Sequence, residues 1–394
     1  VARAIGANNH RRARRLATDS LILSFGITAI IGVIGALTVW PLFRRLGAPD
    51  DMIPLIAGYM YILYAGVPFV VVGMVGMSSM RATGDTRLPS MLMVLASVLN
   101  IILDPILIFG VGPIPALGLN GAALAALLSR ASIFIGTLYL MKRRLDLLTF
   151  NKPERQELIS SWKDILHVGI PAAGTNAIIP IATGVITAML AQYGPETVAG
   201  FGVASRVESL TLVLFYALSA IIGPFVGQNI SANRPDRIYR ALWLCTVFCI
   251  GSGLVMAGGL AIVREWLPGL FSESAEVIGV AAAFLLIVPI SYGAYGMVMV
   301  MNASFNGMGK PMPAVHISVG RMVVIYVPLA MWLDRLFPVW GIFAAYTIAN
   351  IVTGIVAYAW ARASVQGQCD MHAVPTSTTA EAGQAGAAVS TRDR

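Results

Sequence analysis

The chain has 394 residues, of which 57% are hydrophobic and 12% are charged, and its mean hydropathy is +0.77. Soluble domains carry about 25% charged residues, so the composition excludes a soluble globular protein. The formal net charge of +8 would suit a nucleic-acid partner, but the basic residues lie in short turns between apolar runs, which excludes that class as well.

Ten apolar stretches, taken in chain order, are each long enough to cross about 30 Å of hydrocarbon as a helix. They are predicted at residues 16–43, 54–80, 88–110, 119–141, 164–190, 198–228, 239–263, 275–302, 313–333 and 339–361. Polar turns separate them, and none shows the alternating pattern of a membrane β-barrel strand. The predicted fold is therefore all-α and integral to the lipid bilayer.

The basic residues are distributed unevenly between the two sides of the predicted membrane domain. Ten crossings place alternate loops on alternate sides. Twenty Lys and Arg residues lie in the group of loops that includes both chain ends, and four lie in the other group. Because positively charged loops remain in the cytoplasm, both termini are predicted to be cytoplasmic and the protein to reside in the plasma (inner) membrane.

The longest connection on the basic side divides the chain. Residues 142–163 carry six Lys and Arg residues and are predicted to be a cytoplasmic linker. This gives an N-terminal lobe at 1–141 and a C-terminal lobe at 164–362. Residues 363–394 are rich in Ala, Thr, Ser and Gly, and this composition predicts a disordered cytoplasmic tail.

An internal repeat relates the two lobes. Ala7-Asn8 and Ala232-Asn233 are 225 residues apart, and each is followed by two arginines at the same spacing. Four later pairs are 223 residues apart: Gly84 with Gly307, Pro105 with Pro328, Pro115 with Pro338, and Gly118 with Gly341. Equivalent turns lie on the same side, so the repeat is parallel, and a substrate path is expected between the lobes.

The repeat also predicts helices that the given sequence does not contain. The second copy holds two helices before its Ala232-Asn233 turn, whereas the first copy has no counterpart before Val1. We therefore expect twelve helices in a complete protein, of which ten are visible.

One carboxylate lies deep inside an apolar span. Asn100 and Asp104 are four residues apart and share a helix face, which Ser97 extends. The proline at 105 lacks an N–H, so the carbonyl of Ile101 loses its helical partner. A carboxylate, an amide oxygen and a free carbonyl suit a small hard cation such as Na⁺, or a proton on the acid. The repeat equivalents of Asn100 and Asp104 are valines, so an ion site is expected in the first lobe only. The alternative is a carboxylate paired for structure.

Five other residues are candidates for a substrate cavity. Arg206 and Glu208 lie inside the sixth span and, being two residues apart, point to different faces. Asn176 lies four residues before a proline, which frees its carbonyl. Met74 and Met77 could form an adaptable surface, although ordinary packing explains them as well.

Other sequence features argue against an enzyme. No Walker A motif, metal-ligand cluster or Ser/His/Asp constellation is present, so no cofactor is predicted beyond the coupling ion. Four further polar residues inside or near spans are explained by interhelical hydrogen bonds: Arg130, His167, His316 and Arg321.

Several motifs resemble the multidrug and toxic compound extrusion (MATE) family. They are the opening run Val1–Ala7, the turn Arg81-Ala82-Thr83-Gly84-Asp85, the Asn100-x-x-x-Asp104-Pro105 helix, and the run Gly121-Ala122-Ala123-Leu124-Ala125. Gly227-Gln228-Asn229 and Ala204-Ser205-Arg206 fit the second half. The resemblance covers about residues 1–362.

The resemblance implies two six-helix lobes and the export of organic cations or drugs in exchange for Na⁺ or H⁺. We expect a monomer. In the branch similar to the DNA-damage-inducible members, it implies an ion site that uses a helix-five Asn and Asp, which match Asn100 and Asp104. That branch also has a helix-one carboxylate, which has no counterpart here, and a helix-six threonine, which is replaced by Ala126.

Two other readings stay open. A lipid-linked saccharide flippase of a related superfamily would need a cationic central cavity, whereas only three arginines lie within the spans. A truncated, non-transporting relic is the second alternative.

Overall fold

The structure is a computed structural model, and it describes residues 1–47, 49–113, 115–151 and 154–373. The helices are α1 (Ala2–Gly6), α2 (His10–Arg45), α3 (Ile53–Arg81), α4 (Arg87–Phe109), α5 (Gly118–Arg143), α6 (Arg155–Ala191), α7 (Pro195–Thr211), α8 (Val213–Ser231), α9 (Pro235–Val263), α10 (Trp266–Gly269), α11 (Ala275–Ile287), α12 (Tyr292–Met308), α13 (Pro311–Val319), α14 (Val327–Asp334) and α15 (Trp340–Ala373). A 3₁₀ turn at Val288–Ser291 joins α11 to α12, and a π-helical segment at Gly320–Tyr326 joins α13 to α14.

The described ranges contain ten helical spans that are long and apolar enough to cross a membrane, which confirms the predicted number and the all-α class. The sixth predicted span, 198–228, is broken in two at Leu212, between α7 and α8. Most large apolar side chains on the outer faces are exposed, as expected for helices that contact lipid rather than water.

Two boundaries predicted from composition need correction. The last helix, α15, continues to Ala373, so residues 363–373 are helical and not part of a disordered tail, while 374–394 lie outside the described residues. The inter-lobe connection is shorter than 142–163, because α5 ends at Arg143 and α6 begins at Arg155. Alanine and glutamine favour helix even where hydropathy is low, which explains the longer α15.

Local signals position several helix ends. Prolines occupy the first turn of α7, α9 and α13, where a missing N–H costs nothing. The Asn9 side chain caps α2 by accepting from the Arg12 N–H at 2.9 Å. Asn8 and Asn233, which the repeat pairs, both adopt positive φ, at 56° and 52°.

The repeat pairing at the turn before α4 differs from the prediction, which pairs Gly84 with Gly307. Gly84 has φ of 92°, and the glycine with matching backbone in the second copy is Gly309, with φ of 76°, rather than Gly307. The turn before α13 therefore keeps the 225-residue spacing of the Asn8 and Asn233 pair.

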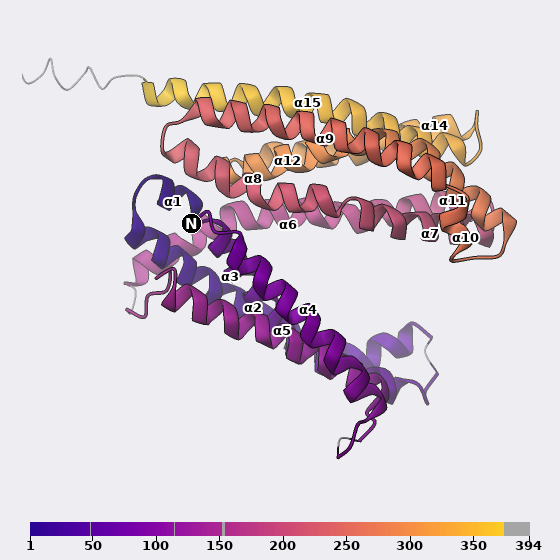
Figure 1. The fold of residues 1–394 in the computed structure, drawn as a ribbon, viewed down its shortest axis with the longest axis horizontal. Coiled ribbons are helices and arrows are strands. Elements are labelled where there is room, and N and C mark those ends of the chain that lie inside the picture. The colour runs from indigo at the N-terminus through magenta and orange to yellow at the C-terminus, as the bar shows by residue number, and fades with distance from the viewer. Residues whose placement is uncertain (48, 114, 152–153, 374–394) are drawn as a thin grey trace, which may run out of the picture.

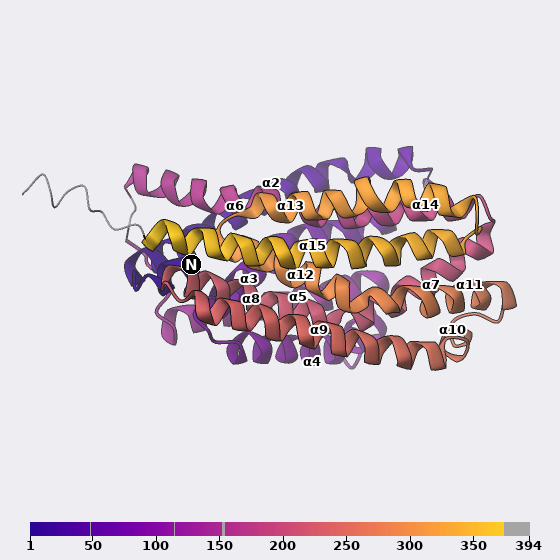
Figure 2. The same ribbon diagram turned by 90° about the horizontal axis from the view of Figure 1, so that it is seen from above.

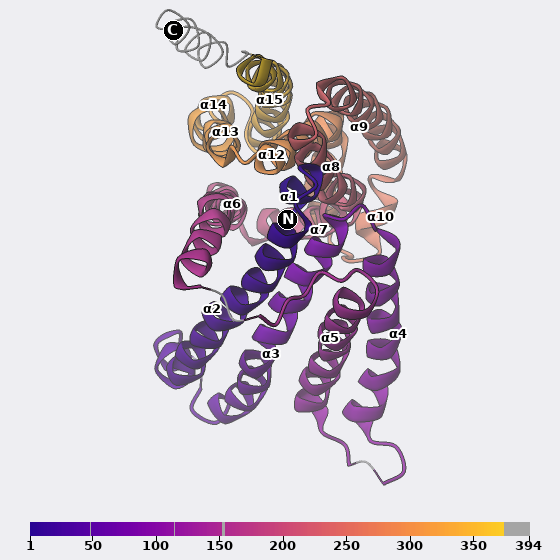
Figure 3. The same cartoon turned by 90° about the vertical axis from the view of Figure 1, so that its left-hand side faces the viewer.

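The helices form two bundles. In the N-terminal bundle α2 packs on α3, α3 on α5, and α5 on α4. The C-terminal bundle comprises α6–α15 and is organised around α12, which packs against α8, α9 and α15. Figure 3 shows the two bundles end-on, and Figure 2 shows that their helices run along a common long axis.

The bundles meet at one end and diverge at the other. In Figure 1 the N-terminal bundle approaches the C-terminal bundle near the first residues and slopes away from it toward the loop between α4 and α5. The main contacts at this end are those of α1 with α8 and α12, of α2 with α6, and of α3 with α8. The described turns at this end are those predicted to be cytoplasmic.

Candidate functional site

The structure places the predicted ion-site residues on α4 of the N-terminal bundle. The Asn100 amide Nδ2 donates to Asp104 Oδ1 at 3.3 Å, so the predicted pair on one helix face is present. Both side chains are half-buried. Within the described ranges, Asp104 has no cationic partner within 4 Å, so it is not part of a structural ion pair there.

The other two residues predicted for this site, Ser97 and Ile101, are placed less favourably for binding an ion. Ser97 is exposed, and its hydroxyl donates to the Met93 carbonyl of its own helix at 2.9 Å. Ile101 is 72% exposed, and its contribution would come only from its main-chain carbonyl. The side-chain chemistry is therefore concentrated in Asn100 and Asp104.

A proton and a metal cation place different demands on the residues of this site. A hard cation takes about six oxygen ligands, whereas a proton needs one carboxylate. The Asn100 and Asp104 side chains offer few oxygens, and no cluster of three or more His, Cys, Asp or Glu side chains occurs in the part of the chain that the structure describes.

A second group of polar residues lies inside the C-terminal bundle. A cavity of about 210 Å³ is lined by α6, α7, α8, α11, α12, the π-helical segment and α15. Glu208 lines it from α7 and Arg321 from the π-helical segment. The Arg321 Nη1 donates to Asn350 Oδ1 of α15 at 2.8 Å, which confirms the interhelical hydrogen bond expected for this residue.

The remaining substrate-cavity candidates are dispersed. Asn176 lines a neighbouring cavity between α6, α8 and α12. Arg206 is exposed on the face of α7 opposite to Glu208, which agrees with the two-residue spacing. Met74 is 57% exposed and Met77 is buried in the N-terminal bundle, so neither shares a cavity with Glu208. The spacing of residues along the chain does not distinguish a cavity wall from a packed core. For that reason the sequence prediction groups four residues that the fold keeps apart.

Sequence reasoning missed a buried ion pair and most of the cavity wall. Arg15 and Asp19 form an i, i+4 ion pair on α2 and are 5% and 0% exposed. The four-residue spacing on a helix is a signal for such a pair, but the basic residues before the first predicted span, Arg15 among them, are assigned to a loop by the sequence prediction. The tyrosines of the C-terminal cavity gave no signal, because aromatic residues are ordinary in apolar spans.

Comparison with known proteins identifies a group of relatives. The MatE family profile matches residues 1–106 and 171–332. A FAD transporter of Shewanella oneidensis is 37% identical over 361 residues, which cover 91% of this chain and 79% of that protein. The probable multidrug resistance protein YoeA of Bacillus subtilis is 25% identical over 369 residues, covering 91% of this chain and 79% of that protein.

Solved structures of transporters are also similar to this chain. The Vibrio cholerae MATE transporter VcmN in its bent form superposes with a TM-score of 0.85 at 28% identity, covering 93% of this chain and 83% of that one. A MOP superfamily transporter from Pyrococcus furiosus superposes with a TM-score of 0.84 at 27% identity, covering 93% and 82%. These relatives are transporters and not enzymes.

Proposed function

The chain belongs to the MATE family of multi-pass membrane transporters, and from this premise we propose that it is a secondary active exporter whose coupling ion binds at Asp104. The observation that carries the proposal is the Asn100–Asp104 pair on α4, which lies inside a span and has no cationic partner among the described residues. An ionisable side chain inside a span is costly, by up to about 2.5–3.5 kcal/mol at the helix centre on insertion scales, so a functional role is the simpler explanation.

The proposed mechanism depends on a change in the charge of the Asp104 carboxylate. When the carboxylate is ionised, it favours contact with water or with a cation, and when it is protonated it favours an apolar surrounding. An ion that binds one arrangement of the two bundles more tightly than the other shifts their equilibrium by that difference in affinity. Alternating access would then follow from rocking one bundle against the other.

The orientation follows from the charges. The basic group of loops, as far as the structure describes them, lies at the end where the bundles meet, so we assign that end to the cytoplasm and describe this conformation as closed toward it. The opposite end, where the helix axes diverge, would face outward.

We assign drugs or organic cations as the first substrate class, in line with relatives such as YoeA and the export protein MepA of Staphylococcus haemolyticus, which is 25% identical over 362 residues. A second candidate is a flavin dinucleotide. It is favoured by the 37% identity to the Shewanella FAD transporter, which is higher than the identity to these multidrug relatives.

The test is transport by the purified protein in lipid vesicles. Ethidium and FAD are offered separately, with an imposed pH or Na⁺ gradient, and flux is followed by fluorescence. We expect gradient-driven flux of one of the two, and a fall of at least about tenfold in Asp104→Asn. Asp236→Asn, which removes an exposed carboxylate at the start of α9, is the matched control. Wild-type flux in Asp104→Asn would refute the proposal.

A further inference from the structure

The cavity inside the C-terminal bundle contains several buried polar atoms that have no hydrogen-bond partner in the described structure. They are Ser205 Oγ, Glu208 Oε1, Arg321 Nε and the Tyr326 hydroxyl, and all four residues line the cavity. Arg321 is 5% exposed and Tyr326 is 1% exposed. A buried polar atom without a partner costs about 1–3 kcal/mol, so four of them around one space indicate a site for something that hydrogen-bonds to them.

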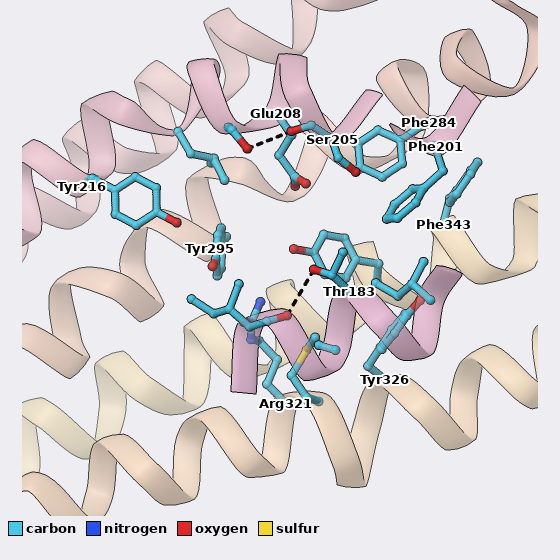
Figure 4. A pocket seen from close by; sticks show the side chains of 17 residues that line it. Thr183, Phe201, Ser205, Glu208, Tyr216, Phe284, Tyr295, Arg321, Tyr326 and Phe343 are labelled. Carbon is cyan, nitrogen blue, oxygen red and sulfur yellow. Dashed lines mark hydrogen bonds between the residues drawn. The ribbon is translucent and has the colours of Figure 1, made fainter. Parts of the chain in front are cut away.

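The two charged side chains face each other without touching. Figure 4 shows Glu208 and Ser205 on one side of the pocket and Arg321 and Tyr326 on the other. No N···O distance of 4 Å or less joins Glu208 to Arg321 in the described chain. A structural ion pair in a dry interior would be in direct contact, because separated charges lose most of the attraction that offsets their desolvation.

Arg321 is held in place by groups that leave its charge available. Its guanidinium donates to Asn350 and lies 4.5 Å from the centre of the Tyr295 ring, as a cation–π contact. Neither partner is negatively charged. The π-helical segment Gly320–Tyr326 carries both Arg321 and Tyr326 to the cavity, and such segments are frequent at functional sites.

The walls between the charged ends are aromatic. They comprise Phe201, Tyr216, Phe284, Tyr295, Phe343 and Tyr346. Drug-sized ligands occupy pockets of about 300–1,000 Å³, so a volume of about 210 Å³ suits a smaller molecule with one ring. The neighbouring cavity shares Ile179, Tyr216, Tyr295 and Arg321 with this one, so the two spaces adjoin at the Arg321–Tyr295 contact.

We propose that this cavity is a binding site for a small zwitterionic aromatic molecule, whose ammonium group pairs with Glu208 and whose acidic group pairs with Arg321. The ring would stack between the aromatic walls, and Ser205 and Tyr326 would supply the remaining hydrogen bonds. Each charge of the ligand then meets a charge that the fold leaves unpaired. The site is independent of Asp104, which lies in the other bundle.

The experiment measures equilibrium binding to the detergent-solubilised full chain without an ion gradient, by calorimetry. The probes are L-tyrosine, tyramine, which lacks the carboxylate, and 3-(4-hydroxyphenyl)propionate, which lacks the amine. We expect tyrosine to bind at least about tenfold more tightly than either analogue. Equal affinities for the three probes, or no binding of tyrosine, would refute the proposal and leave a cavity that holds water only.

Variants locate the site. Glu208→Gln keeps the side-chain shape and should weaken tyrosine binding by at least about tenfold, while Tyr326→Phe removes only an unpartnered hydroxyl and should weaken it less. Arg206→Gln, on the opposite face of α7, is the control and should bind as the wild type does. Asp104→Asn should also bind normally, so failure of this site is distinguishable from failure of the proposed transport function. Unchanged tyrosine affinity in Glu208→Gln would overturn the assignment.

Discussion

The side-chain amide of Gln228 donates to the main-chain carbonyl of Ala82 at 2.7 Å and so ties α8 to the end of α3, across the two bundles. A second tie lies at the same end of the molecule, where Arg12 of α2 pairs with Asp164 of α6 at 2.8 Å. These polar links hold the bundles together where they converge, and the alternating access proposed above would require that such links break.

Removing the Gln228 link should open that end of the molecule. One hydrogen bond contributes about 1 kcal/mol net, so Gln228→Ala should shift the equilibrium between closed and open ends by about fivefold. Spin labels at Arg87 and Arg234 would report this opening. In Gln228→Ala, the distribution of electron–electron distances between the two labels would gain a second, longer component. Asn229→Ala is the control, because its amide donates to Phe225 within α8 and should leave the distances unchanged. Identical distributions in both variants would contradict this role for Gln228.

Substitutions along α4 should have graded effects on ion coupling. Asn100→Ala removes a neutral hydrogen-bond donor to Asp104 and should weaken coupling several-fold, less than Asp104→Asn does. Ser97→Ala should have no effect, because its hydroxyl is already engaged with Met93. The measurement is flux against the external ion concentration. A larger loss in Ser97→Ala than in Asn100→Ala would show that the ion lies toward Ser97.

The orientation can be tested by cysteine labelling in intact cells, in a variant that lacks the natural cysteines. Single cysteines at Gly112 or Pro195 should react with an impermeant maleimide from outside, and one at Gln156 should not. All three positions are exposed, so access depends on the side of the membrane alone. The reverse pattern would overturn the assignment of the termini to the cytoplasm.

The close approach of α9 and α12 predicts a sensitive position. A Cβ at Gly253 would collide with the backbone of Gly293, so Gly253→Ala should destabilise the fold by about 1–3 kcal/mol. Gly258 lies in the same helix with open space around its Cβ position, so Gly258→Ala should be neutral or stabilising by up to about 1 kcal/mol. Thermal unfolding in detergent measures both, and equal melting temperatures would contradict the packing.

The spans, the repeat and the family resemblance could all be read from the sequence. Hydrocarbon imposes a length and an apolar composition on each crossing, and both are local properties of the chain. The Asn100–Asp104 pair was also readable, because residues four apart on a helix must share a face. The break at Leu212 was not readable, since apolar composition continues through it.

The C-terminal cavity was decided only by tertiary structure. Glu208, Arg321 and Tyr346 belong to three helical segments far apart in the chain, and no local pattern relates them. Each is ambiguous by itself, because an ionisable residue in a span serves equally well in a structural pair. Only the packed bundle shows that Glu208 and Arg321 share one space without contact. The physical reason is that apolar burial selects which helices cross a membrane, whereas the packing of one helix against another selects which side chains meet.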